Sequence, residues 1–299
     1  MSRLKKAKRK TSDRKFEILL IAILSILGIL VAYPLIYVLS SSFSSASAVM
    51  SGKVWLFPVE FGLDGYRAIF KNSQVLIGYR NSLFYMVAGT CINVVMTLMA
   101  AYALSRSDLP GQGPIMLIFT FTMIFSGGMI PTYLVIKNLH MLNTVWSMLI
   151  PGAISVNNMI ITRTFIKNSI PNEMLEAAKI DGCNDVQYFF NMVLPLSGSV
   201  IAVITLYYAI SHWNSYFNAF MYLSDQKLYP LQLFLRDILI SNKVDASMVI
   251  VDDAAAAKEG LAELLKYSLI VVAMLPVMII YPFVQKHFVK GVMIGSIKG

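Results

Sequence analysis

Six long apolar runs, separated by polar segments, dominate the pattern along the chain. In a bilayer, a single run satisfies its own backbone hydrogen bonds only as a helix. At ~1.5 Å per residue, a run of about 20 residues crosses the ~30 Å hydrocarbon core. The pattern therefore predicts an all-α integral membrane protein with six transmembrane helices. They cover Ile18–Ser40, Ser82–Leu104, Pro114–Ile136, Asn143–Thr164, Ser197–Leu223 and Leu264–Val284.

Composition supports lipid as the solvent of these runs. The 299 residues are 57% hydrophobic and only 14% charged, whereas a soluble domain carries ~25% charged residues. The net charge of +9 could indicate a nucleic-acid partner. However, eight of the 25 Lys and Arg lie in the first 15 residues, just before the first apolar run. A basic block in that position is typical of a membrane topology signal.

The distribution of Lys and Arg also predicts the orientation. With the N-terminus in the cytoplasm, 15 of these residues fall in inner segments and 10 in the much longer outer segments. The higher density inside places both termini in the cytoplasm. The first run, at 23 residues, is too long for the ~7–15-residue core of a signal peptide. We divide the chain into a basic tail (1–17), a transmembrane domain (18–284) and a C-terminal tail (285–299).

Two outer segments, 41–81 and 224–263, are predicted to form packed external caps. Tyr66–Ile77 and the Ala-rich stretch Asp252–Leu261 are the parts most typical of short helices there. Kinks are predicted where proline or a glycine pair interrupts a run, at Pro34, Pro131, Pro276 and Gly127-Gly128.

The segment 169–195, between the fourth and fifth runs, is predicted to form two short helices around a glycine. Ser169 can cap the first helix, with Pro171 in its first turn. Gly182 permits the positive φ that ends it. Asn184 with Gln187 resembles a capping box for the second helix.

The first of these helices has an unusual surface. Ala177 and Ala178 leave a bare patch beside the charged Glu176. A bare patch lets another backbone approach closely, so the combination favours docking to a soluble protein. The alternative is an ordinary amphipathic helix lying on the membrane.

The spacing of this segment resembles a known family. Glu176-Ala177-Ala178 is followed after three residues by Gly182, and nine residues later by Met192, one residue and Leu194-Pro195. This is similar to the EAA loop of bacterial ABC importer permeases, with Met192 in place of the family's isoleucine. The resemblance implies a coupling-helix loop that docks to an ATPase subunit. The coupling residues it implies are Glu176, Ala177, Ala178, Gly182, Leu194 and Pro195.

Further motifs resemble the carbohydrate branch of that family. They are Trp213-Asn214, Leu223-Ser224-Asp225, Tyr229-Pro230-Leu231, and the C-terminal Gln285–Gly291 and Gly295–Gly299. Together they are similar to the second membrane subunit of maltose-type importers, in the subgroup that moves oligosaccharides. The resemblance implies a bacterial plasma-membrane permease with four kinds of partner: a homologous second permease, two ATP-binding subunits, an external sugar-binding protein and a sugar substrate.

The resemblance implies no enzymatic activity and no cofactor in this chain. The chain has no G-x-x-x-x-G-K-[ST] phosphate loop, so ATP and Mg²⁺ are expected to bind to the partner ATPase. Cys91 and Cys183, with only three histidines in the chain, form no metal pattern.

The fifth run is the richest in polar and aromatic side chains, which normally face a bundle interior or a cavity within a membrane. They could line a sugar pathway, or they could bridge helices. The candidate pathway residues are Tyr208, His212, Trp213, Asn214 and Asn218, with Asn157 from the fourth run.

Three other readings stay open at this point. A secondary transporter often carries buried carboxylates, but no run interior here contains Asp or Glu. A membrane enzyme would need a metal cluster or a nucleophile motif. An ABC permease for a non-sugar solute is opposed only by the branch-level motifs.

Overall fold

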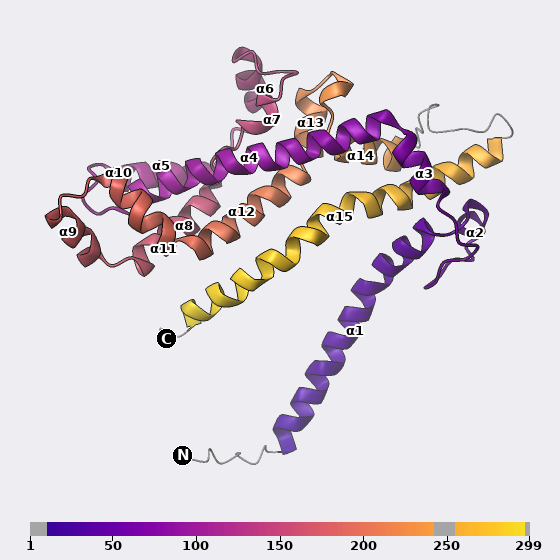
Figure 1. Cartoon of the computed structure of the whole chain (residues 1–299), viewed down its shortest axis with the longest axis horizontal. Helices are drawn as coiled ribbons and strands as arrows, with labels where there is room; N and C mark the ends of the chain where they lie inside the picture. The colour runs from indigo at the N-terminus through magenta and orange to yellow at the C-terminus, as the bar shows by residue number, and fades with distance from the viewer. Residues whose placement is uncertain (1–10, 242–254, 297–299) are drawn as a thin grey trace. The chain divides into compact units, whose positions relative to one another are not determined.

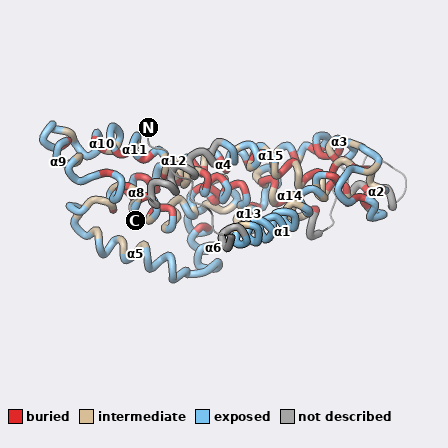
Figure 2. Tube along the Cα trace, turned by 90° about the horizontal axis from the view of Figure 1, so that it is seen from below, coloured by how far each residue is buried: buried red, intermediate tan, exposed pale blue. Residues whose placement is uncertain are grey.

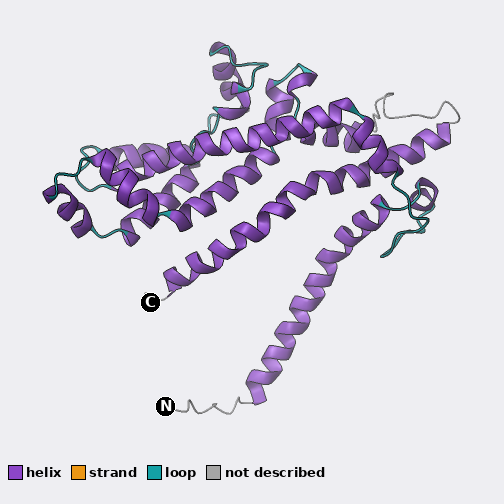
Figure 3. Ribbon diagram, in the orientation of Figure 1, coloured by secondary structure: helices purple, strands orange, loops and turns teal. Residues whose placement is uncertain are grey.

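The computed structural model describes residues 11–241 and 255–296, with the side chains of 15–238, 260 and 262–282. The described segments form helices joined by loops (Figures 1 and 3). The helices are α1 (Thr11–Ser42), α2 (Ala46–Met50), α3 (Asp64–Lys71), α4 (Ser73–Ser105), α5 (Gln112–Ile124), α6 (Met129–Asn138), α7 (Trp146–Leu149), α8 (Val156–Ser169), α9 (Asn172–Ile180), α10 (Asp185–Tyr188), the π-helix η1 (Phe189–Val193), α11 (Leu194–Leu196), α12 (Gly198–Trp213), α13 (Tyr216–Tyr222), the short η2 (Gln226–Leu228), α14 (Leu231–Ser241) and α15 (Ala255–Ser296).

Three helices are long and apolar enough to cross a membrane. They are the parts Lys15–Ser42 of α1, Ser73–Ser105 of α4 and Ala262–Pro282 of α15. Two further candidates are helix pairs bent at a short break: α5 with α6, at 117°, and residues 185–196 with α12, at 81°. The all-helical, multi-pass character predicted from the apolar runs is confirmed.

The third predicted span, Pro114–Ile136, is not one straight helix. It stops at Ile124 and restarts at Met129, and Gly128 between them has φ +88°. That backbone conformation is favourable only for glycine and cannot continue a right-handed helix. The kink predicted at Gly127-Gly128 is therefore a full break.

The fourth predicted span, Asn143–Thr164, was also wrong as a continuous helix. The four-residue α7 is separated from α8 by residues 150–155, where Pro151 removes a backbone N–H and Gly152 has φ +81°. Ser155 then caps α8, its side chain accepting a hydrogen bond from Asn158 N. The Pro-Gly pair thus interrupts an otherwise apolar run.

The chain divides into two compact units, residues 1–71 with 244–272, and residues 72–243 with 273–299. In the first unit, Ala48, Val49 and Val54 pack against Leu264 of α15. Close approach there depends on Gly65, because an added Cβ would lie 2.2 Å from the Ser268 hydroxyl. Most residues of α1 are exposed (Figure 2), and most of these exposed residues are apolar, as in a lipid-facing helix.

In the second unit, α4 is the central helix, and it packs against α8, α12 and α14. Buried polar contacts fix its register. The hydroxyls of Thr97 and Tyr208 lie 2.6 Å apart, and Tyr208 Oη also accepts a hydrogen bond from Ser155 N. Trp213 is buried, and its Nε1 donates to the carbonyl of Ala273 at 3.0 Å.

The segment that leads from α13 to α14 is held on α4 by side-chain hydrogen bonds. Asn81 Nδ2 donates to the carbonyls of Lys227 and Tyr229, at 2.7 and 3.0 Å. Tyr85 Oη donates to the carbonyl of Leu228, and Ser82 Oγ accepts from Leu231 N. This part of the predicted cap is therefore packed. Of the predicted Ala-rich stretch, 252–254 lies outside the described residues and the rest begins α15.

We expect Asn81→Ala to lower the stability of the permease unit. The substitution removes the two hydrogen bonds to the carbonyls of Lys227 and Tyr229 at a buried position, a loss of about 1–3 kcal/mol. Thermal denaturation of the purified protein in detergent measures the effect. Gln74→Ala is the matched control, because Gln74 bonds to Gln226 on the same segment in an exposed position. Equal shifts for the two variants would contradict the role of Asn81.

Candidate functional site: a coupling loop and a polar cavity

The loop 169–195 begins differently from the prediction. Ser169 is the last residue of α8, and Pro171 is the N-cap of α9, so Ser169 caps neither helix and Pro171 stands before the first turn. The reason is local. The ring of Pro171 excludes the helical region for Ile170, which takes φ −113° and ψ 107°.

The middle of the loop confirms the predicted turn. Gly182 has φ +77°, and its N–H donates to the carbonyl of Lys179 while Cys183 N donates to that of Ala178. This pair of bonds is the Schellman arrangement that ends α9. Asn184 and Gln187 then form the predicted capping box, with bonds of 2.8 and 3.0 Å.

The two faces of α9 have different surroundings. Ala178 is only 7% exposed and belongs to a core with Ala101, Leu104 and Ile166. Glu176 and Ala177 are exposed, and the neighbouring Ile180 is 86% exposed. The predicted bare patch thus consists of Ala177 alone, because Ala178 is the contact that holds α9 to the core. The outer face combines a carboxylate with exposed apolar surface, as a docking surface would.

The end of the loop contains a break in helical geometry. Leu194 N donates to the carbonyl of Phe189, five residues back, in the π-helix η1. Pro195 has no N–H to donate four residues back, which favours the wider turn. The chain then bends by 81° between α11 and α12 at the buried Ser197. Leu194 packs against Leu98 and Val200 in the core beside it, while Pro195 is exposed.

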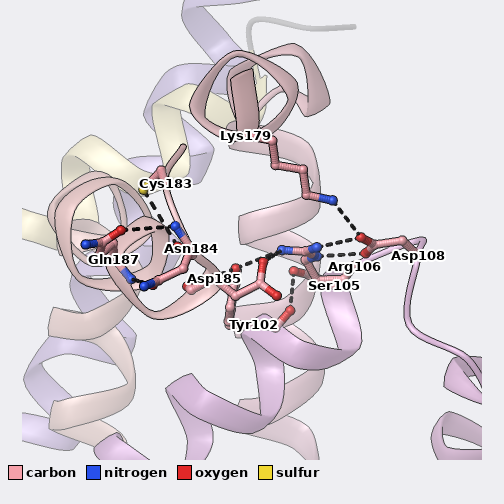
Figure 4. A network of polar contacts seen from close by, with 9 residues as sticks. All are labelled: Tyr102, Ser105, Arg106, Asp108, Lys179, Cys183, Asn184, Asp185 and Gln187. Atoms are coloured by element: carbon pink, nitrogen blue, oxygen red, sulfur yellow. Dashed lines mark hydrogen bonds and ion pairs between the residues drawn. The ribbon is translucent and has the colours of Figure 1, made fainter. Parts of the chain in front are cut away.

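A network of charged side chains connects this loop to the end of α4 (Figure 4). Arg106 pairs with Asp108 through two hydrogen bonds and with Asp185 through a third, at 2.6 Å. Lys179 Nζ also donates to Asp108, at 3.1 Å. The hydrogen bonds from Arg106, followed by that from Lys179, hold the pKa of Asp108 well below its usual range.

A polar cavity of about 670 Å³ lies among α4, α8, α12, α13 and the break at 150–155. Its lining is made of amides, hydroxyls, one imidazole and a few apolar groups, and none of the lining side chains is a carboxylate, Lys or Arg. The lining residues are Asn93, Met148, Pro151, Gly152, Ser155, Asn157, Asn158, Tyr207, Tyr208, Ser211, His212, Asn214, Ser215, Phe217 and Asn218.

The cavity brings together five of the six predicted pathway residues: Tyr208, His212, Asn214, Asn218 and Asn157. Trp213 lies apart from it, buried against Tyr79 and bonded to Ala273, so its role here is packing. Sequence reasoning missed Asn93 and the Pro151–Ser155 break, because their position depends on contacts between distant helices.

Two lining residues have buried polar atoms without a partner among the described residues. They are Asn93 Oδ1 and His212 Nε2. The imidazole of His212 lies directly against Gly89, where an added Cβ would be 2.4 Å from the ring. Both atoms are almost completely shielded from solvent, and buried polar atoms without partners are costly.

Comparison with known proteins identifies the chain. The family described as "Binding-protein-dependent transport system inner membrane component" matches residues 75–294. The chain belongs to this family. The matched region includes nearly all of α4, the loop 169–195 and the whole cavity lining. The permease is therefore a transporter subunit and not itself an enzyme.

Relatives of the permease agree with this assignment. It is 42% identical to the polygalacturonan/rhamnogalacturonan transport system permease protein YtcP of Bacillus subtilis (strain 168), over 96% of this chain and 99% of the relative. The melibiose/raffinose/stachyose import permease protein MelC of the same organism is 25% identical, over 88% of this chain and 90% of that protein.

A solved structure matches the fold. It is the crystal structure of a bacterial ABC transporter involved in the import of the acidic polysaccharide alginate. The matched chain is 33% identical, with a TM-score of 0.87, over 95% of this chain and 100% of that chain. The permease is thus similar along nearly its whole length to a subunit of an ABC importer.

We expect Gly182→Ala to loosen the coupling loop. Space is not the constraint, because nothing lies within 4 Å of an added Cβ, but a left-handed backbone costs an L-residue about 1–2 kcal/mol. Hydrogen–deuterium exchange of residues 172–188 should be faster than in the wild type. Gly198→Ala is the control, because Gly198 also has open space but no positive φ. Unchanged exchange in Gly182→Ala would contradict the prediction.

Proposed function

We propose that the permease forms half of the pore of an ATP-binding-cassette importer for a sugar or oligosaccharide. The single observation that carries the proposal is the loop 169–195, in which the EAA spacing is folded as a capped, partly exposed helix pair on a family-typical membrane domain. The relatives' names and the alginate importer support a carbohydrate cargo.

The coupling loop is the contact with an ATP-binding subunit. Its docking surface consists of Glu176, Ala177 and Ile180, while Met174, Leu175 and Ala178 anchor α9 to the permease core. ATP and Mg²⁺ bind to the ATPase subunits, and their closure moves this loop. A second permease and an external sugar-binding protein complete the importer.

The topology has six crossings with both termini in the cytoplasm of a bacterial cell. Three are α1, α4 and α15, and a fourth is the bent pair α5–α6. The fifth is α12 with α13 after it, and residues 185–196, which bend away from α12 by 81°, belong to the loop side. The sixth is the interrupted segment α7–α8. Non-helical backbone at membrane depth is tolerated where it lines a cavity, and residues 150–155 do so here.

The cavity forms part of the cargo pathway. Amides and hydroxyls from α8, α12 and α13 offer donors and acceptors to a polyhydroxylated ring, and Tyr207, Tyr208 and Phe217 offer aromatic surface. The uncharged lining also lets cargo leave, because it holds ligands through individual hydrogen bonds of only about 0.5–1.5 kcal/mol each.

We expect Glu176→Lys to uncouple the permease from its ATPase subunit. The charge reversal lies on the exposed face of α9, so membrane insertion should be unaffected. Binding-protein-stimulated ATP hydrolysis by the assembled complex should fall about 5–150-fold, the range of coupling energies of ~1–3 kcal/mol. Glu173→Lys, also exposed in α9 but outside the motif, is the control. Wild-type hydrolysis in Glu176→Lys would overturn the assignment of the loop.

We expect Asn157→Ala and Asn218→Ala to slow cargo movement. Each removes one amide from the cavity lining and should reduce uptake about 2–12-fold, as one lost hydrogen bond of ~0.5–1.5 kcal/mol does. Uptake of radiolabelled oligogalacturonate and raffinose by the assembled transporter measures it. Those sugars are suggested by the relatives' names.

The control for the cavity is Asn138→Ala, which removes an exposed amide at the end of α6, away from the lining. Uptake that falls equally in Asn138→Ala, or in neither cavity variant, would argue that the cavity packs helices and does not contact cargo.

A further inference from the structure

The end of α4 carries the densest group of ion pairs in the described part of the chain (Figure 4). We propose that Arg106 is a positioning residue that fixes both coupling helices to α4, so that movement of the loop reaches the cavity along α4. The proposal rests on the proposed function of the loop, and it concerns a residue outside the EAA spacing.

Arg106 sits where α4 ends and α10 begins, close to the last turn of α9. It is the C-cap of α4, and its side chain is only 12% exposed. Its Nε and Nη2 donate to the two oxygens of Asp108, at 2.7 and 2.5 Å. Its Nη1 donates to Asp185 in the first turn of α10, at 2.6 Å, and to the Tyr102 hydroxyl at 3.0 Å.

The second coupling helix is joined through Asp108. Lys179, in the last turn of α9, donates to the Asp108 oxygen that Nη2 of Arg106 also reaches. Arg106 therefore contacts α10 directly and α9 through one bridging carboxylate. Without Arg106, the negative charges of Asp108 and Asp185 would lose their shared cation, and Lys179 would be the remaining cation paired with Asp108.

Neighbouring contacts fix the same point to the rest of the membrane domain. The carbonyl of Leu104, two residues before Arg106, accepts hydrogen bonds from Arg163 Nε of α8 at 2.7 Å and from Gln112 Nε2 of α5 at 2.5 Å. The end of α4 is thus a junction at which α5, α8, α9 and α10 meet.

The contacts at this junction differ in strength. Lys179 and Asp108 are both about half exposed, and exposed pairs of that kind contribute little. Arg106 is largely buried and holds one carboxylate through a two-bond fork, which is the stronger geometry. Loss of Arg106 should therefore have a much larger effect than loss of Lys179.

The junction matters for transport because α4 is one unbroken helix from the junction to the cavity. Three residues of α4 contact the cavity or its lining. The Thr97 hydroxyl is hydrogen-bonded to that of Tyr208, and Asn93 itself lines the cavity. Gly89 leaves room for the imidazole of His212. Asn93 lies 13 residues before Arg106 on one continuous helix, about 20 Å away at ~1.5 Å per residue. Two other elements connect the loop to the cavity. Helix α8 is continuous from Asn157 and Asn158 in the lining to Ser169, and it reaches the same junction through the hydrogen bond from Arg163 to the Leu104 carbonyl. The connection through α11 to α12 contains a π-helix and an 81° bend.

The test follows the cavity directly in the complete transporter, reconstituted in liposomes. In a background with Cys91→Ser and Cys183→Ser, Ser211→Cys places a single thiol in the cavity lining. Its rate of maleimide labelling is measured with and without ATP and vanadate. Arg106→Gln should reduce the ATP-dependent change in labelling about fivefold or more, while the ATPase subunits still co-purify. Arg106→Lys should restore part of it.

Lys167→Gln is the matched control, because Lys167 is exposed in the last turn of α8 with no ion pair described. It should respond to ATP as the parent does. A full ATP response in Arg106→Gln would overturn the proposal. If Arg106→Gln fails to assemble, Asp185→Asn tests the same link from an exposed position, and a full response there overturns the proposal.

Failure of the proposed function gives a different result. In that case no ATPase subunit would co-purify with the parent permease, and maleimide labelling of the parent would not respond to ATP. That result would also remove the basis for the role of Arg106. Loss of thermal stability in Arg106→Gln with an unchanged ATP response would leave Arg106 a purely structural residue and would overturn the inference.

Discussion

The requirement that buried backbone groups be hydrogen-bonded determines where this chain is regular and where it breaks. α4 meets the requirement alone for 33 residues, and α7, α8, α12, α14 and η2 pack on it. At residues 150–155, between α7 and α8, the backbone is not helical and polar side chains form the hydrogen bonds instead. Ser155 caps α8, and Tyr208 Oη accepts a hydrogen bond from the Ser155 N–H. Those side chains also line the cavity, so the break in the fourth apolar run and the polar site are two consequences of one constraint.

Sequence reasoning succeeded where the signal is local. The positive φ at Gly182 and the Asn184–Gln187 capping box need only a few neighbouring residues, and both were predicted. It failed where distant segments decide. Gly127-Gly128 was predicted to kink a helix, but whether a glycine pair kinks or stops a helix depends on what can satisfy the freed backbone. The break at Pro151 was not predicted. The roles of Asn93 and Arg106 depend on contacts with α8, α9, α10 and α12, which no spacing along the chain reveals.

The two alanines of the coupling loop illustrate the same limit. Their adjacency suggested one bare surface, yet on a helix, successive residues point about 100° apart. Ala178 therefore packs inward while Ala177 stays exposed. A small residue at 178 lets α9 approach the core around Leu104 and Ile166 closely, and a small residue at 177 leaves room outside. The same residue type meets two different steric requirements.

In the proposed mechanism, the charged junction at the end of α4 stays intact when the loop moves. Asp108 is its most sensitive member, since protonation would remove an acceptor for both Arg106 and Lys179. Its pKa is lowered in the folded protein, so its contribution is present above the unfolded-state pKa and is lost only as the pH falls through the lower folded value. Arginine remains charged throughout the physiological range. The ion pairs of the junction therefore persist across the physiological pH range, and the junction is not a pH switch.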